Sequence, residues 1–280
     1  MTTTIAPTEL STAWSSWHTA REQLLTTEHG WLSLVGFHWL PELPTELAGV
    51  PGRWSVAGER AVLAADSAEG LVLAGGSQQG AAVDGIVTGS VAEAGSMLWV
   101  SYRDVVVELI LRGGRYAIRL RDPAGPERAA FTGVPAFPVD PTWIRPGRFT
   151  ALAVPGRITV ETARSDLRQQ VTAVGTVEVE IDGQLHSLVA TAGQGGRLNL
   201  SFTDPTNRTE TAPWRVVSTS VPTESGSLVV DFNRAVNLPF AFTEFGTCPA
   251  PVAGNALPVR VTAGELAPIR VTGPGPGAQS

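Results

Sequence analysis

Hydrophobic residues recur at helical spacing near the start of the chain. The residues on this face are Leu10, Trp14, Trp17, Leu24 and Leu25. With Thr8 in the N-cap position and Gly30 as the stop, the pattern predicts an amphipathic helix over residues 8–29, within an N-terminal helical segment 1–30. Two tryptophans at this spacing are typical of core packing rather than of a cofactor site.

The next run, GWLSLVGFHWL at residues 30–40, is too rich in bulky apolar residues to be a surface loop. We predict a buried strand or a tight bend here. His38 lies inside this run, where a histidine is typically a hydrogen-bonded core residue rather than a catalytic one.

From residue 53 to residue 122 the pattern changes to short apolar runs separated by glycine. Short strands at close spacing indicate a sandwich or barrel rather than parallel βαβ units. The clearest hairpin spans Val105 to Arg121, because Gly113-Gly114 supplies the positive φ that two-residue turns require. On its second strand Arg115, Arg119 and Arg121 alternate with apolar residues, and we interpret this stripe as a solvated face rather than an anion site.

A second series of β-type runs follows the proline-dense segment 137–147, where we place the domain boundary. The runs are RITVETA, TVEVEID, QLHSLVA, RLNLSFTD, WRVVSTS, SLVVDFN and LPVRVTAGE. The predicted fold is therefore mainly β: an N-terminal helix followed by two antiparallel β-sandwich or barrel domains. Their predicted limits are residues 31–146 and residues 147–267, and we expect the segment 268–280 to be a disordered tail.

Composition excludes several classes of protein. All 20 basic residues are arginine, so the chain has no lysine for a P-loop, a protein kinase or Schiff-base chemistry. A formal net charge of -6 argues against a nucleic-acid partner. The start of the chain resembles no signal peptide and no apolar run is long enough to span a bilayer, so we expect a cytoplasmic protein with no membrane partner.

The sequence shows no motif for a metal or cofactor. The four histidines have no metal-site spacing, and neither a GxSxG elbow nor a dinucleotide GxGxxG motif is present. Cys248 is the single cysteine and precedes a proline, with no histidine close to it in sequence. We predict that it packs as a small hydrophobe and is not a nucleophile.

The segment 231–265 is the best candidate for a functional site. It is long and aperiodic, and it mixes polar side chains with four phenylalanines, so we expect it to be ordered. If its polar groups converge on a pocket, the segment binds a small molecule or catalyses a reaction. The candidate catalytic residues are Asp231, Arg234 and Glu265. The candidate ligand-binding residues are Asn233, Asn237, Thr243 and Asn255.

The alternative is that these polar groups only satisfy each other and the backbone, as in a non-enzymatic binding or scaffold module. Asp231 and Arg234 would then form a partly buried ion pair. If that pair is buried, Arg234→Ala should lower the free energy of unfolding by about 3–5 kcal/mol. The sequence does not set the oligomeric state.

Four blocks together resemble the domain-of-unknown-function 1684 family. They are HGWLSLVGFHWL at 29–40, RGGRYAIRLRD at 112–122, FPVDPTW at 137–143 and the whole segment 231–265. The resemblance implies a mostly β prokaryotic protein and brings no established activity. The first half of the family is also faintly similar to forkhead-associated sandwiches, which implies an interaction domain as the alternative function.

Overall fold

A computed structural model describes residues 7–270. The start of the predicted helical segment, residues 1–6, and residues 271–280 of the predicted tail lie outside the described residues. The chain divides into two compact units. Of the described residues, unit 1 contains 7–23 and 132–269, and unit 2 contains 24–131 and 270. The helix that we assigned to a segment of its own thus groups mostly with the C-terminal β residues, and so do residues 132–146.

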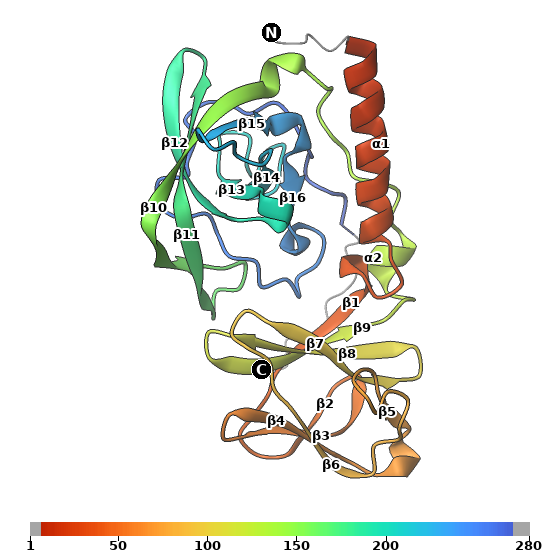
Figure 1. Cartoon of the computed structure of the whole chain (residues 1–280). Coiled ribbons are helices and arrows are strands. Elements are labelled where there is room, and N and C mark those ends of the chain that lie inside the picture. The colour runs from red at the N-terminus through yellow and green to blue at the C-terminus, as the bar shows by residue number, and fades with distance from the viewer. Residues whose placement is uncertain (1–6, 271–280) are drawn as a thin grey trace. The chain divides into compact units, whose positions relative to one another are not determined.

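Unit 2 consists of two antiparallel sheets. The five-stranded sheet has the order β1-β9-β8-β7-β5, and the four-stranded sheet has the order β2-β3-β4-β6 (Figure 1). The strands are β1 (Leu34–Trp39), β2 (Thr45–Leu47), β3 (Val50–Ala57), β4 (Arg60–Ala65), β5 (Leu71–Leu73), β6 (Gly85–Gly89), β7 (Ser96–Tyr102), β8 (Val105–Arg112) and β9 (Arg115–Arg121). The short helices are η1 (Trp31–Ser33), η2 (Ser67–Glu69) and α2 (Pro126–Ala129).

Alternating apolar residues of both sheets form the core of unit 2. Trp54 and Trp99 meet edge to face with ring centroids 5.6 Å apart, and both are almost fully buried. Aromatic pairs favour this arrangement because the positive ring edge meets the negative ring face. The sandwich prediction is confirmed for this unit.

The hairpin of β8 and β9 forms as predicted, but two of its arginines are not solvated. Gly113 and Gly114 have φ of 58° and 73°, as the tight turn requires. Arg119 and Arg121, expected on a solvated face, are buried, and Glu108 on β8 pairs with both at 3.6 and 2.8 Å. The solvated-face interpretation is wrong, because alternation predicts which side of a strand a residue occupies but not what covers that side.

Unit 1 is built on a seven-stranded antiparallel sheet with the order β15-β10-β11-β12-β13-β14-β16. The strands are β10 (Ile144–Glu161), β11 (Arg168–Ile181), β12 (Gln184–Ala192), β13 (Leu198–Phe202), β14 (Arg215–Ser218), β15 (Ser227–Asp231) and β16 (Val236–Asn237). Its helices are α1 (Pro7–Leu25), η3 (Pro141–Trp143), η4 (Gln194–Gly196), η5 (Phe232–Arg234) and η6 (Pro239–Ala241). The fold is mainly β and sandwich-like, and the sheets of the described chain do not close into a barrel.

The chain after β15 is irregular but well packed. Phe232 packs edge to face on Phe202 and on Trp143, with centroids 5.7 and 5.8 Å apart. The strand predicted over LPVRVTAGE does not form, and this run instead carries only an isolated bridge from Glu265 to Ala136. Its alternating apolar residues are buried without a neighbouring strand, which a period-2 pattern cannot reveal.

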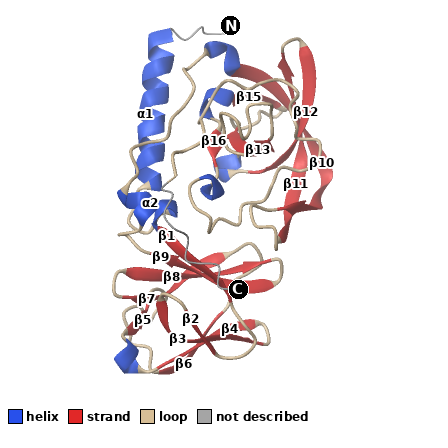
Figure 2. Cartoon of the chain, turned by 180° about the vertical axis from the view of Figure 1, so that it is seen from behind, coloured by secondary structure: helices blue, strands red, loops and turns tan. Residues whose placement is uncertain are grey.

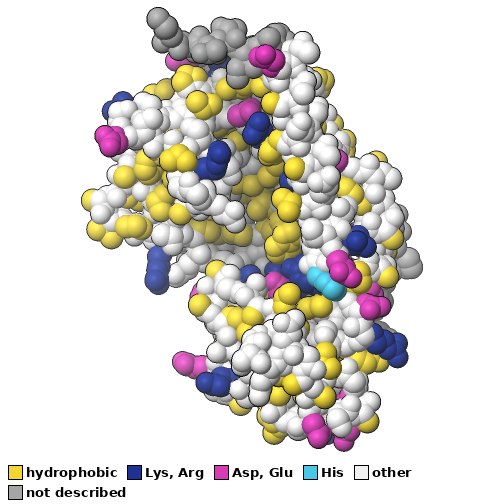
Figure 3. All heavy atoms as spheres, turned by 45° about the vertical axis from the view of Figure 1, so that its right-hand side comes forward, with side chains coloured by type: hydrophobic (Ala, Val, Ile, Leu, Met, Phe, Trp, Pro, Cys, Tyr) yellow, Lys and Arg dark blue, Asp and Glu magenta, His cyan; other side chains and the backbone are white. Residues whose placement is uncertain are grey.

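Helix α1 ends at Leu25, earlier than predicted, because two β-branched threonines follow it and Gly30 turns back to the Thr27 carbonyl. Figures 1 and 2 show α1 running along one side of the strands of unit 1. Hydrophobic side chains gather in a hollowed strip of the same unit (Figure 3). Within residues 7–270, no helix is both long and apolar enough to cross a bilayer.

Strand β10 has an exposed stretch at residues 150–155. Its ladder with β11 is interrupted between Ala151 and Gly156, and β15 pairs only with its first residues, Ile144 to Arg148. Leu152 is 45% exposed and Val154 is 77% exposed. This part of the strand is therefore an apolar sheet edge that the described residues leave uncovered.

Candidate functional site

Asp231 and Arg234 lie at the two ends of helix η5. The Asp231 carboxylate caps the helix by accepting the backbone N–H of Asn233, and it lies 3.4 Å from Nε of Arg234. The side chains are 21% and 40% exposed. The guanidinium lies over the ring of Trp17 on α1, 5.3 Å from its centroid. The expected pair forms, but it is too exposed to make the stability contribution of a buried pair.

Glu265 is fully engaged inside unit 1. One carboxylate oxygen accepts from Nε of Arg21 at 3.2 Å, and the other accepts from the backbone N–H of Asn237 at 2.6 Å. Arg21 also donates to the Asn237 carbonyl at 2.8 Å. The carboxylate thus anchors α1 to the segment 231–265.

The candidate ligand-binding residues mostly bond to the backbone. The Asn233 amide spans the Asp140 main chain, accepting from its N–H and donating to its carbonyl at 2.9 Å each. The Asn255 amide accepts the N–H of Val189 and donates to the Val189 carbonyl. Both asparagines therefore cross-link separate segments of the fold.

Asn237 and Thr243 complete the set, and both are buried. Asn237 donates to the Leu266 carbonyl at 2.7 Å, and the Thr243 hydroxyl accepts from the N–H of Phe245 at 3.3 Å. The structure thus brings Asp231, Asn233 and Arg234 together at η5, and joins Asn237 with Glu265. Thr243 and Asn255 make separate contacts.

The fully buried ion pair of unit 1 is Arg215 with Asp204, 3.2 Å apart, with both side chains 0% exposed. Besides Asp204, Arg215 donates to the carbonyls of Ala263, at 2.5 Å, and Val261, at 3.0 Å. Burial lowers the pKa of the Arg215 guanidinium, and the neighbouring Asp204 carboxylate opposes that shift. This pair holds residues 204, 215 and 261–263 together.

Sequence reasoning missed this pair. Arg215 stands directly after Trp214 at the start of a strand, and nothing in its spacing distinguishes it from the exposed arginines. The available signal was weak: Asp204 is followed by PTN, a turn sequence in which aspartate commonly bonds the backbone two residues on. That bond forms, from the N–H of Thr206 to Asp204 at 3.1 Å.

A pocket of about 600 Å³ opens beside this pair, between residues 203–214 and 250–256. Residues lining it include Thr203, Asp204, Arg208, Trp214, Pro251 and Ala253. Its size falls in the usual range for a small-molecule site, and its walls combine apolar residues with a few polar groups. The second half of the candidate segment therefore contributes one wall of a pocket.

Trp214 is the most informative residue of that pocket. It is 8% exposed, and its ring stacks on Phe240 with centroids 4.0 Å apart. Its indole Nε1–H is buried and has no hydrogen-bond partner within the described chain. A buried donor without an acceptor costs about 1–3 kcal/mol, so a group that supplies an acceptor there is favoured.

The charged side chains around the pocket differ in whether they form ion pairs. Asp204 is neutralised by Arg215, and Glu161 pairs with Arg168 at 2.7 Å. Arg208 is exposed, and its backbone is left-handed with φ of 67°. The charged group left to face a ligand is thus the Arg208 guanidinium, which favours hydrogen-bond acceptors.

Two further observations concern chemistry at this site. Cys248 is half-buried, and its carbonyl accepts the N–H of Ala163. Among residues 7–270, no three His, Cys, Asp or Glu side chains gather in a geometry that could hold a metal ion.

Residues 129–266 match the model of a family whose description is "Protein of unknown function (DUF1684)". Over these residues the chain is similar to the DUF1684 family. The match supports the resemblance to this family that the sequence suggested, and it covers the blocks at 137–143 and 231–265 together with the pocket of unit 1. The DUF1684 description assigns no activity.

Other comparisons add no activity. No curated protein matches the chain significantly. Among solved structures, the solution NMR structure of an uncharacterized protein from Haloarcula marismortui is similar, with 26% identity and a TM-score of 0.43. That similarity covers 52% of this chain and 82% of the other.

Proposed function

We propose that unit 1 is a non-enzymatic binding module whose pocket between residues 203–214 and 250–256 takes a small molecule. The ligand class is a compact organic molecule with an apolar body and acceptor oxygens, such as a carbonyl or carboxylate group. This keeps the small-molecule prediction for the segment 231–265 and moves the site from its first residues toward Asn255.

One observation carries the proposal: Trp214 lines a pocket of about 600 Å³, and its indole N–H is buried without an acceptor among the described residues. Native proteins leave few buried donors unsatisfied, so each such donor requires an explanation. A ligand that shifts the Trp214 ring can bring an acceptor oxygen to this N–H, and Arg208, which lines the same pocket, supplies a second donor. The apolar wall at Pro251 and Ala253 suits a hydrocarbon body.

The catalytic alternative assigns acid-base chemistry to Asp231, Arg234 and Glu265. Both oxygens of Glu265 accept from Arg21 and the backbone, and Asp231 caps η5. Groups held in this way stabilise the fold. A carboxylate that acts as a general base must instead lie within reach of the substrate proton that it accepts. These contacts support binding over catalysis.

The sequence also lacks the serine and histidine pattern with which forkhead-associated domains read phosphothreonine, so that interaction role is not favoured.

The test is a thermal-shift screen of small metabolites on the full chain and on two pocket variants. Trp214→Phe removes the N–H and keeps an aromatic ring, and Ala253→Trp fills the pocket from an exposed position. We expect some compounds with a carbonyl or carboxylate group to raise the melting temperature of the wild type. The shift should shrink in Trp214→Phe and vanish in Ala253→Trp.

Trp39→Phe, in unit 2, is the matched control and should respond like the wild type. Compounds that stabilise Ala253→Trp as much as the wild type would show that the pocket is not the site. Turnover of a bound compound that is lost in Glu265→Gln or Asp231→Asn would instead support the catalytic alternative. Fractionation of cells that express the chain checks the predicted cytoplasmic location.

A further inference from the structure

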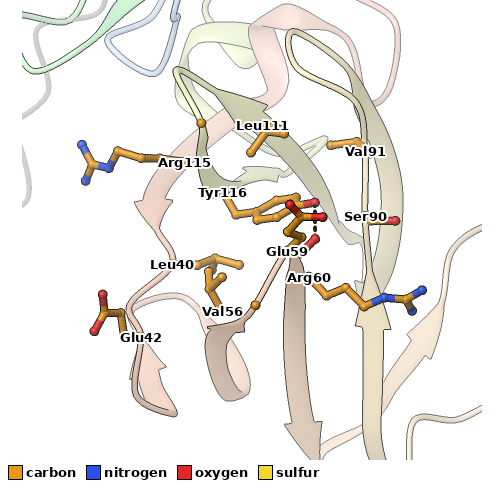
Figure 4. A pocket seen from close by; sticks show the side chains of 12 residues that line it. Leu40, Glu42, Val56, Glu59, Arg60, Ser90, Val91, Leu111, Arg115 and Tyr116 are labelled. Atoms are coloured by element: carbon orange, nitrogen blue, oxygen red, sulfur yellow. Dashed lines mark hydrogen bonds between the residues drawn. The ribbon is translucent and has the colours of Figure 1, made fainter.

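We infer that unit 2 contains a second, independent ligand site at the open end of its sandwich, and that this site binds an amine with an apolar body. The cavity there has a volume of about 830 Å³. Residues from both sheets line it, so it lies where the two layers separate (Figure 4). It belongs to the part of the chain outside residues 129–266, which the family match covers.

The cavity wall is a continuation of the sandwich core. Leu40, Val56, Leu111 and Val91 line the cavity, and all four also pack against the buried core cluster of unit 2. Figure 4 shows Leu40 and Val56 on one side of Tyr116, with Leu111 and Val91 on the other. A hydrocarbon body placed between them buries apolar surface, at about 25 cal/mol for each Å² removed from water.

The polar groups at the centre of the cavity offer acceptors. Tyr116 donates its phenol hydrogen to the carbonyl of Glu59 at 3.0 Å, so its oxygen keeps lone pairs that can accept. The Glu59 side chain stands beside the phenol end of Tyr116 (Figure 4). An ionised carboxylate has acceptor oxygens and no donor, so a ligand group that contacts both Glu59 and the Tyr116 oxygen must be a hydrogen-bond donor.

The arginines of the cavity are turned away from this centre. Arg60 and Arg115 point outward in opposite directions (Figure 4). Arg60 donates to the Thr88 hydroxyl at 3.1 Å, and Arg115 lies 4.0 Å from the centroid of the Trp39 ring. Glu59 forms no ion pair with any residue that the structure describes, so its charge favours a cationic ligand.

A matched pair of probes tests this inference on the full chain. 2-Phenylethylammonium and 3-phenylpropanoate share a phenylethyl body and carry opposite charges. By calorimetry at low salt, we expect the ammonium compound to bind at least about tenfold more tightly than the carboxylate, because only the former donates to Glu59 and Tyr116.

Three variants locate the binding. Ser90→Trp, at an exposed position on the cavity wall, should abolish it by filling the opening. Glu59→Gln should weaken it about threefold, as expected for a partly solvated ion pair. Glu224→Gln removes an exposed carboxylate from unit 1 and should leave the affinity unchanged. Melting curves of each variant confirm that it is folded.

Two results would overturn the inference: equal affinity for both probes, or binding that survives in Ser90→Trp. Absence of binding by the ammonium probe at millimolar concentration would also overturn it. Because the cavity lies in unit 2, a failure here leaves the proposed pocket of unit 1 untouched.

Discussion

The buried guanidinium of Arg215 and the partly exposed guanidinium of Arg234 differ in what their removal leaves behind. Without Arg215, the Asp204 carboxylate is left buried without its cation, so we expect Arg215→Met to lower the free energy of unfolding by about 3–5 kcal/mol. Without Arg234, Asp231 keeps its partial contact with solvent and its cap on η5. We therefore expect Arg234→Ala to cost less than about 1 kcal/mol.

Urea unfolding of both variants, followed by circular dichroism, measures this difference. Arg157→Ala, which removes an exposed arginine from β10, is the control and should unfold like the wild type. A loss at Arg234→Ala as large as that at Arg215→Met would mean that the Asp231–Arg234 pair is buried in solution.

His38 makes the free energy of unfolding depend on pH. Its half-buried position lowers the pKa of the imidazole below 6.5 by desolvation, although a hydrogen bond to the Ala48 backbone acts in the opposite direction. Between the lowered pKa and 6.5 the unfolded chain binds more protons than the folded chain, so the folded state loses stability as the pH falls through this window.

We therefore expect the wild type to lose more stability than His38→Gln between about pH 7.5 and about pH 5.5. The two proteins should be compared by chemical unfolding at both pH values. An equal loss in the two proteins would assign the acid sensitivity to other groups.

At the scale of elements, helix α1 is fixed to unit 1 by specific polar contacts. The indole of Trp14 donates to the Asn233 carbonyl at 2.6 Å, and Arg21 bonds the buried Glu265 at 3.2 Å. Hydrogen bonds to charged groups contribute about 1.5–3 kcal/mol, so Arg21→Ala should destabilise unit 1 by that amount.

A double-mutant cycle with Glu265→Gln isolates this interaction. We expect the double variant to be more stable than the sum of the two single losses predicts, because the amide no longer leaves a buried charge uncompensated. Strict additivity would show that the contact between Arg21 and Glu265 contributes nothing to the docking of α1.

Sequence patterns predicted the elements that depend on residues close together in the chain. The β8–β9 hairpin follows from Gly113-Gly114, and the aperiodic segment after Asp231 does form short helices and irregular structure. The contacts of the candidate site could not be predicted in this way. Arg21 and Glu265 are 244 residues apart, and their meeting depends on where a helix docks rather than on spacing.

Burial was the harder quantity to predict. Arg119 and Arg121 alternate with apolar residues in the manner of exposed side chains, yet Glu108 on the neighbouring strand makes their burial possible. A strand pattern contains no information on a pairing charge from another strand. The same limit hid Arg215, whose partners lie between 9 and 50 residues away.

At the scale of the whole molecule, the two units give the chain two separate candidate sites. The DUF1684 match covers residues 129–266 and thus most of unit 1. It leaves out α1 and almost the whole of unit 2. In the two proposals, the pocket beside Trp214 supplies donors to its ligand and the cavity beside Tyr116 supplies acceptors. The two proposals therefore select ligands of opposite hydrogen-bonding character, and one compound series can separate them.

The uncovered edge of β10 has a consequence for handling the protein. An apolar strand edge is a template on which another chain can add a strand, and natural sheets block such edges with bulges and prolines. Here the break in the ladder and Pro155, which has no N–H to donate, block the edge next to the exposed Leu152 and Val154.

We expect Pro155→Thr to self-associate at concentrations where the wild type scatters little light, while its far-ultraviolet circular dichroism at low concentration is unchanged. Light scattering over a dilution series measures the shift, and an unchanged threshold would mean that the bulge alone protects the edge. If the threshold falls as expected, the ring of Pro155 determines how concentrated a stock of this protein can be kept.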